Sequence, residues 1–146
     1  MIFDNTLLLS DQQAITADAA STNTIDLQGT GSPFGGSAIV KDVGRSARVP
    51  LAILVTEAFN NVTSLQVQVQ ISPDNATWET IESGRVIPLA TLVSGHQVKV
   101  IDSLPEGTNA RYVRLFYDIT GAAPTTGKIT AGVVMARQTN YTYGGR

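Results

Sequence analysis

The sequence contains no cysteine and only one histidine, His96. The missing thiols exclude disulfide bridges, thiolate zinc sites and cysteine nucleophiles together. A serine–histidine–carboxylate triad would have to use His96, yet no serine stands in the G-x-S-x-G motif that marks many such nucleophiles. His96 follows a Ser-Gly turn and opens an alternating segment, so a polar residue at a strand end is the simpler interpretation. We therefore expect that this chain is not an enzyme.

Carboxylates are also not arranged in a recognisable site. Asp74 and Asn75 share one predicted turn. Asp102, Glu106 and Asn109 share another. Neither turn has the ligand spacing of a calcium loop, and turn chemistry explains both, because such side chains bond to nearby backbone amides. Glycoside hydrolysis needs two carboxylates at a defined separation, and the sequence singles out no pair. We expect no metal and no cofactor.

Positive charge and long apolar runs are scarce as well. Ten lysines and arginines stand against twelve aspartates and glutamates, which gives a formal net charge of −2. A nucleic-acid-binding protein should concentrate basic side chains on one face, so no nucleic-acid partner is predicted. No segment approaches the roughly 20 apolar residues of a membrane span. The short leucine run at residues 7–9 has no basic region before it, so neither a secretory signal nor a membrane partner is predicted.

The clearest pattern in the sequence is an alternation of apolar and polar residues, which repeats every two positions. Residues 65–71, LQVQVQI, place four aliphatic side chains on one face and three glutamines on the other. In residues 111–119, RYVRLFYDI, an apolar set can face a core while Arg114 and Asp118 face solvent. Tyr112 and Phe116 then lie on the outer face. Further strands are predicted within residues 50–59, 85–93, 96–101 and 127–137.

Turn-forming clusters separate these strands, namely SPDN, SG, PEGTN and GAAPTTG. No window keeps a helical period over three turns; residues 11–21 come nearest and would support only a short helix. Short strands with turns between them predict an all-β fold. We expect a single domain over residues 1–146, an antiparallel β-sandwich of jelly-roll type.

Three segments depart from the strand pattern. Residues 1–9 are interpreted either as an extended N-terminal arm or as the first strand of the domain's own sheet. Residues 21–49 form a predicted long loop, with Gly-rich GTGSPFGGS at its centre, and loops of this length are usually functional or disordered. Residues 139–146, TNYTYGGR, form a predicted polar C-terminal tail, for which exposure to solvent is the plainer interpretation.

Two stretches resemble discoidin-like and carbohydrate-binding jelly rolls: SPDNATWETI at residues 72–81 and ARYVRL at residues 110–115. The resemblance implies a sandwich and, as an alternative function, a carbohydrate-binding module or host-surface-binding domain. Sugar sites need aromatic platforms and convergent polar groups, and the sequence supplies no recognisable set. Trp78 follows a tight turn directly, so we expect it to cap the hydrophobic core.

A second resemblance covers most of the chain. Residues 1–27, the Gly-rich loop and the strand PLAILV are similar to capsid cement proteins of tailed phages, of the Bordetella podovirus type. This resemblance implies a virion protein, made in the host cytoplasm, on the outer surface of an icosahedral capsid. Its implied partners are the major capsid protein, whose subunit contacts it stabilises, and a second copy in a dimer. It implies no chemistry.

A protein of that kind favours extended segments that spread over several partners. The N-terminal segment could dock apolar side chains or add a strand to a sheet edge. Aromatic residues and arginine are enriched at interface hot spots, which singles out similar side chains in the loop and the tail. The candidate partner-binding residues are Phe3, Leu7, Leu9, Phe34, Tyr141, Tyr143 and Arg146. The glutamine face of residues 65–71 is a further surface that could lie against a neighbouring subunit.

Overall fold

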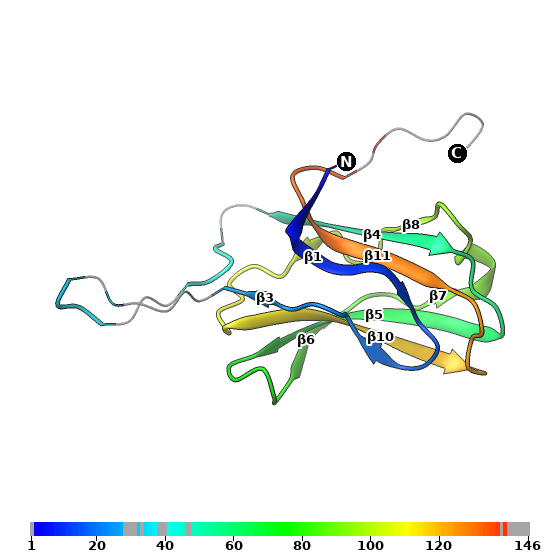
Figure 1. The fold of residues 1–146 in the computed structure, drawn as a ribbon, viewed down its shortest axis with the longest axis horizontal. Helices are drawn as coiled ribbons and strands as arrows, with labels where there is room; N and C mark the ends of the chain where they lie inside the picture. The colour runs from blue at the N-terminus through cyan, green and yellow to red at the C-terminus, as the bar shows by residue number, and fades with distance from the viewer. Residues whose placement is uncertain are drawn as a thin grey trace.

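Two antiparallel sheets pack face to face in the computed structural model, which describes residues 2–27, 32, 34–37, 41–45, 48–137 and 139 (Figure 1). The first sheet has the order β1 (Phe3–Ala14), β11 (Lys128–Val134), β4 (Val49–Glu57) and β8 (Gln97–Val98), with β9 (Ser103–Leu104) also paired to β4. The second has the order β2 (Ala19–Ala20), β10 (Tyr112–Gly121), β5 (Val62–Ser72) and β6 (Glu79–Ser83). Two short strands complete it: β3 (Ile25–Asp26) on β10 and β7 (Ile87–Pro88) on β5. The predicted antiparallel β-sandwich is confirmed.

The centre of the second sheet forms from the two most regular sequence patterns. Leu115 of β10 pairs with Val69 of β5, and Tyr117 pairs with Val67. These four side chains are fully buried against the first sheet, since alternate residues of a strand share a face. Each fully buried aliphatic side chain contributes about 1.5–3 kcal/mol of transfer free energy. The predicted inward and outward faces of both strands are correct.

A buried polar chain joins the two sheets inside this core. The hydroxyl of Tyr117 lies 2.8 Å from Ser10 Oγ on β1, and Ser10 Oγ donates to Gln13 Oε1 at 2.7 Å. Because a serine hydroxyl has one proton, Tyr117 is the donor to Ser10. Burial raises the pKa of Tyr117, which keeps this donor protonated. Gln13 in turn donates to the backbone oxygen of Ala20 at 2.8 Å, next to β10.

The N-terminal residues belong to the sandwich. Residues 3–14 form β1, an edge strand paired with β11, so the structure agrees with the first-strand interpretation of residues 1–9 rather than with a detached arm. The pairing shifts register three times, between Phe3 and Leu8, between Leu8 and Ser10, and between Ser10 and Gln13. These irregularities turn Leu9 and Ser10 toward the core, where both are fully buried. The short helix considered over residues 11–21 is replaced by β1 and β2.

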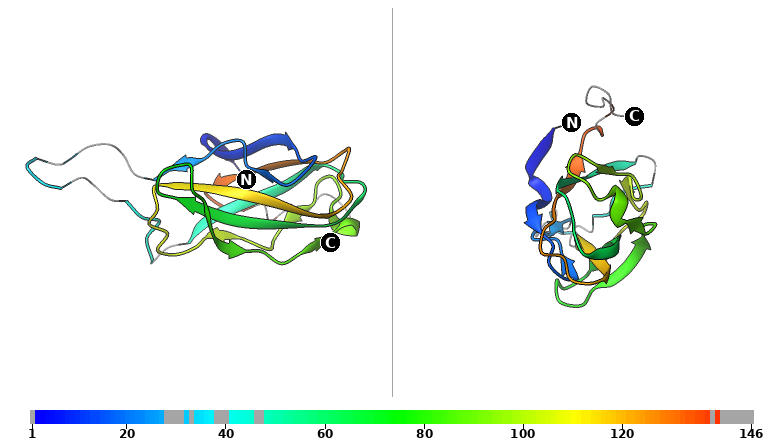
Figure 2. Two further views of the ribbon diagram at one scale, coloured as in Figure 1. Left: turned by 90° about the horizontal axis from the view of Figure 1, so that it is seen from below. Right: turned by 90° about the vertical axis from the view of Figure 1, so that its right-hand side faces the viewer.

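The predicted loop at residues 21–49 begins later than expected. Ser21 donates its backbone N–H to Leu115 O at 2.8 Å, and Leu27 donates to Arg111 O at 2.7 Å. Residues 21–27, which include β3, therefore run alongside β10. Farther along, residues 34–37 lie well away from the sandwich at one end of the molecule (Figures 1 and 2). Of the predicted C-terminal tail, residues 139–146, the structure describes only Thr139.

Two other strand predictions were too long. Within residues 85–93 only β7 is a strand, and a 3-10 turn follows it at Leu89–Thr91. Within residues 96–101 only β8 pairs, against β4. Between β6 and β7, Gly84 is buried and donates its backbone N–H to Val67 O of β5 at 2.8 Å. The strand pairing with β5 stops after β6 and resumes at β7.

Candidate interaction surface

The outer face of the second sheet carries a row of uncharged polar side chains beside charged and aromatic ones. The register pairs Gln66 with Asp118, Gln68 with Phe116, and Gln70 with Arg114. All of these face away from the core, because their neighbours along each strand are the buried residues. The three glutamines are half-buried, so they are partly covered by their neighbours and partly open to solvent.

Hydrogen bonds link four of these side chains and Thr80 into one network. Thr80 on β6 donates to Gln68 Oε1 at 3.1 Å and accepts from Gln70 Nε2 at 3.2 Å. Arg114 Nε donates to Gln70 Oε1 at 2.8 Å, and Gln68 Nε2 donates to Asp118 Oδ2 at 3.4 Å. We call these five residues the glutamine ladder. Since each amide is held by a neighbour, the ladder presents polar groups at fixed positions over β10, β5 and β6.

Trp78 lies at the end of the ladder. The guanidinium carbon of Arg114 is 3.8 Å from the centroid of the Trp78 ring, which is a cation–π contact at stacking distance. Trp78 is two residues before Thr80 and so shares the outer face of the sheet. The expectation that it caps the core was wrong: strand alternation places it half-buried on the surface, and it is not among the core residues. Burial lowers the pKa of Arg114, yet guanidinium groups stay charged in proteins.

The turn before Trp78 is ordered by one carboxylate. Asp74 Oδ1 accepts from the backbone N–H groups of Ala76 at 2.9 Å and Thr77 at 2.8 Å, and from Ser72 Oγ at 2.9 Å. These donors, with Thr77 N–H the largest, lower the pKa of Asp74 to about 2. Asn75 has a φ of 61°, which asparagine tolerates better than most residues. Turn chemistry thus explains Asp74, as the sequence indicated.

A groove runs beside Trp78 at this end of the sandwich. Its lining includes Thr77, Trp78 and Glu79 from the turn and Asn109 and Ala110 from the segment before β10. These two segments are about 30 residues apart in the chain and meet because β10 pairs with β5, which leads into the turn. No local sequence signal links them.

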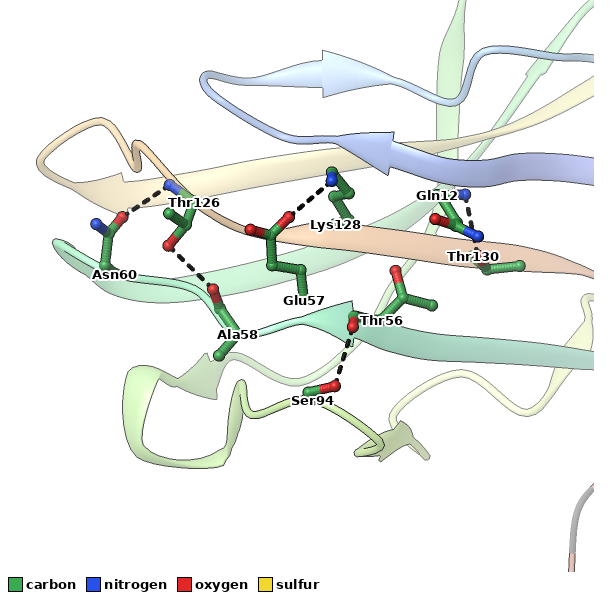
Figure 3. A network of polar contacts seen from close by, with 9 residues as sticks. All are labelled: Gln12, Thr56, Glu57, Ala58, Asn60, Ser94, Thr126, Lys128 and Thr130. Carbon is green, nitrogen blue, oxygen red and sulfur yellow. Dashed lines mark hydrogen bonds and ion pairs between the residues drawn. The ribbon is translucent and has the colours of Figure 1, made fainter.

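The opposite end of the first sheet is held by a separate set of polar contacts (Figure 3). Asn60 Oδ1 accepts from Thr126 N at 3.1 Å, and Thr126 Oγ1 donates to Ala58 O at 3.1 Å. Lys128 and Glu57 form an ion pair at 3.0 Å across β11 and β4. These bonds tie the turn between β4 and β5 to the turn between β10 and β11, so we assign them a structural role.

The predicted partner-binding residues are dispersed. Phe3 and Leu7 on β1 are half-buried, and Leu9 is fully buried in the core, where its side chain packs instead of meeting a partner. Phe34 is fully exposed, in the segment that lies away from β1 (Figures 1 and 2). The three remaining residues lie outside the described part of the chain: Tyr141, Tyr143 and Arg146. Sequence reasoning noted the glutamine stripe but missed Arg114 and Thr80 as parts of the same surface.

Within the described residues, no group of three or more His, Asp or Glu side chains could hold a metal ion. None of those residues belongs to a helix with the length and apolar character of a membrane span. His96 follows the turn at Gly95, where its carbonyl oxygen accepts from Val55 N at 2.9 Å.

The fold and this face define the chain as an antiparallel β-sandwich with a preordered polar surface on one sheet. Its sequence matches the model of the Bbp16 family over residues 9–136, so the chain belongs to the Bbp16 family. The family name indicates a Bordetella phage protein, and the chain is therefore a phage-related protein. No curated protein matches the sequence.

Proposed function

We propose that this chain is a structural virion protein that binds the outer surface of an icosahedral phage capsid and stabilises contacts between major capsid protein subunits. Family membership supports the phage origin. The proposed partners are the major capsid protein and a second copy of the chain. In this role the protein acts by binding, with no catalysis and no cofactor.

The observation that carries the proposal is the glutamine ladder. Its hydrogen-bonding groups are held by one another, so little side-chain freedom is lost when a partner covers them. Arg114 and the aromatic rings of Trp78 and Phe116 lie on the same face, and such side chains are enriched at interface hot spots. The mixture of amides, aromatics and few charges is typical of a protein interface.

Phe34 supports a second point of attachment. Its side chain is fully exposed, and the segment around it lies away from the sandwich at one end (Figure 1). A ring so exposed adds little to the stability of the domain. Two separated contacts on one small protein could engage two capsid subunits at once, and linked contacts raise the overall avidity.

The test is reconstitution on capsids that lack this protein. Heads assembled without it should break or swell under heating or osmotic shock, and added wild-type protein should restore their resistance. Arg114→Ala removes the bond to Gln70 and the stack on Trp78, so its affinity for these heads should fall at least tenfold, as for an interface hot spot. Binding is measured by co-sedimentation.

Arg85→Ala is the matched control, since Arg85 is exposed and lies outside the ladder. It should bind as the wild type does, and circular dichroism should show both variants folded. Heads that resist heat and osmotic shock equally well with and without the protein would remove the stabilising role. Equal binding by both arginine variants would remove the ladder from the interface.

A further inference from the structure

An open strand edge lies at the side of the sandwich where β1 and β3 border the two sheets (Figure 1). We call residues 22–25, which run into β3, the β3 edge. We propose that the β3 edge binds an extended, uncharged segment of the major capsid protein, which joins the second sheet as an added strand. The partner follows from the proposed function, so this contact rests on that function.

A polar notch opens between the two border strands. The strands are joined where Asn23 donates its backbone N–H to Leu9 O at 2.9 Å and its Nδ2 to Leu8 O at 3.1 Å. Next to this junction, residues 4–7 of β1 oppose only Val133 of β11, so β1 bulges out of its ladder. The lining residues of the notch are Asn5, Thr6, Leu8, Thr22, Asn23 and Thr24. None of them is charged, so a charged segment would find no counter-charge in the notch.

The backbone of Thr24 offers the hydrogen-bonding groups that a new strand needs. Ile25 pairs with Val113 of β10, and Leu27 donates its N–H to Arg111 O at 2.7 Å. Alternate residues of a paired strand direct their N–H and C=O groups to opposite sides, so those of Thr24 face away from β10. Within the part of the chain that the structure describes, neither group of Thr24 makes a hydrogen bond. A strand laid along the β3 edge would bond to both.

The β3 edge lacks the charges that usually prevent strand addition. Native sheets protect their borders with charged side chains, since an open edge otherwise pairs with other chains. At the opposite border of the second sheet, β6 carries Glu79 and Glu82. Residues 22–25 carry no charge, and the acid that follows, Asp26, forms an ion pair with Arg111 at 3.0 Å. The difference between the two borders indicates that a partner covers the β3 edge.

The β3 edge also adjoins the face that we propose binds the capsid. The glutamine ladder spans β10, β5 and β6, and β3 pairs with β10 in the same sheet. A capsid subunit that covers the ladder can therefore lay a segment along the β3 edge as well. Backbone hydrogen bonds of an added strand supply affinity, and the two linked contacts raise the avidity.

The first measurement is amide hydrogen exchange of the full chain, free and bound to heads that lack this protein. In peptides that span Thr24, the amide of this residue should exchange at least tenfold more slowly on heads, because an added strand accepts its hydrogen bond. Residues 97–104, which border the other sheet, should exchange alike in both states. Mass spectrometry of the recovered protein gives both rates.

Three variants separate the backbone from the side chain. Thr24→Lys places a charge in the notch, so its affinity for heads should fall at least tenfold in co-sedimentation. Thr91→Lys is the matched control, because Thr91 is also exposed and lies on the 3-10 turn outside the notch. Thr24→Ala keeps the backbone groups. Both of these should bind within about twofold of the wild type, and circular dichroism should show all three folded.

The outcomes separate this contact from the proposed function. If the wild type binds heads and its Thr24 amide is not protected, the added strand is excluded while the capsid role stands. Equal binding by the two lysine variants would contradict the strand as well, and so would an equal loss in Thr24→Ala and Thr24→Lys, which would assign the contact to the side chain. Wild-type protein that does not bind heads would remove the proposed function and this contact with it.

Discussion

At the scale of single residues, the structure shows which hydrogen bonds are made by side chains that the sequence only placed in turns. Asp74 collects two backbone N–H groups and one hydroxyl, and this arrangement directs the chain into β6 with Trp78 on the outer face. Ser72, its hydroxyl donor, is fully buried at the end of β5. The turn is therefore anchored to the core on one side and supports the surface on the other.

The lowered pKa of Asp74 predicts a pH dependence of stability. Its pKa is about 2 in the folded protein and 3.8 when unperturbed, so the unfolded chain takes up the proton more readily. The carboxylate thus stabilises the fold fully above its unfolded pKa, and this contribution is lost as the pH falls from about 4 through 2. The free energy of unfolding is measured by urea titration at several pH values for the wild type and Asp74→Asn.

The difference between the two proteins should be constant from neutral pH to about 5 and should shrink below 4. Taking the difference removes the titration of the other acids, including Asp4, whose pKa is also lowered by its bonds from Thr6. A difference that stays the same down to pH 2 would mean that the charge of Asp74 does not support the turn.

At the scale of elements, β1 is the strand that the sequence defined least well. Its pairing with β11 is interrupted by three register shifts, and bulges of this kind redirect side chains. Close approach of the two strands is possible because Gly132 has no side chain. A Cβ at this position would lie 2.8 Å from Leu7 O and 3.1 Å from Leu8 Cα, both backbone atoms of β1.

Gly132→Ala should therefore push β1 away from β11. We expect a loss of about 1–3 kcal/mol in the free energy of unfolding, the usual cost of overpacking. Amide hydrogen exchange should accelerate in β1 more than in β5, because β5 belongs to the other sheet. Gly36→Ala, in an exposed segment, is the control and should change neither quantity. Unchanged protection of β1 would show that the strand tolerates a methyl group here.

At the scale of the whole molecule, the pairing order supports the jelly-roll prediction. The short strands fall into three successive pairs, each along one partner: β2 and β3 on β10, β6 and β7 on β5, β8 and β9 on β4. With each pair counted as one interrupted strand, the first and last strands are neighbours in one sheet, and the second and next-to-last are neighbours in the other. Such nesting of antiparallel pairs is what two successive Greek keys produce.

The polar chain from Tyr117 through Ser10 to Gln13 joins these two sheets, so its loss should be felt by the whole domain. Tyr117→Phe removes the donor to Ser10 inside the core. It should lower the free energy of unfolding by about 1–2 kcal/mol, as expected for a buried hydrogen bond. Denaturant unfolding measures the change.

Tyr112→Phe is the matched control, because Tyr112 is half-buried on the outer face of the same strand. It should change stability by less than about 0.5 kcal/mol. If the two substitutions cost the same, the hydrogen bond to Ser10 would contribute nothing beyond the burial of the ring.

Much of the fold followed from periodicity. The alternation in β5 and β10 predicted which side chains enter the core, and Val113, Leu115 and Tyr117 are all fully buried. Strand ends were less predictable: residues 85–93 and 96–101 look continuous in sequence but pair over only two residues each. A local pattern records which side chains are apolar, whereas the length of a strand depends on the partner beside it.

The candidate sites also differ in whether local sequence or distant strands determine them. The sequence by itself determined the glutamine face and the Asp74 turn, because both depend on neighbours within a few residues. Only the tertiary structure decided that Leu9 enters the core and that Trp78 lies outside it. The first follows from the bulges of β1 against β11, and the second from the pairing of β6 with β5, which puts Trp78 on the outer face, where Arg114 of β10 stacks on it. These outcomes depend on strands that are distant in the chain, and strand pairing is set by the packing of the whole sandwich.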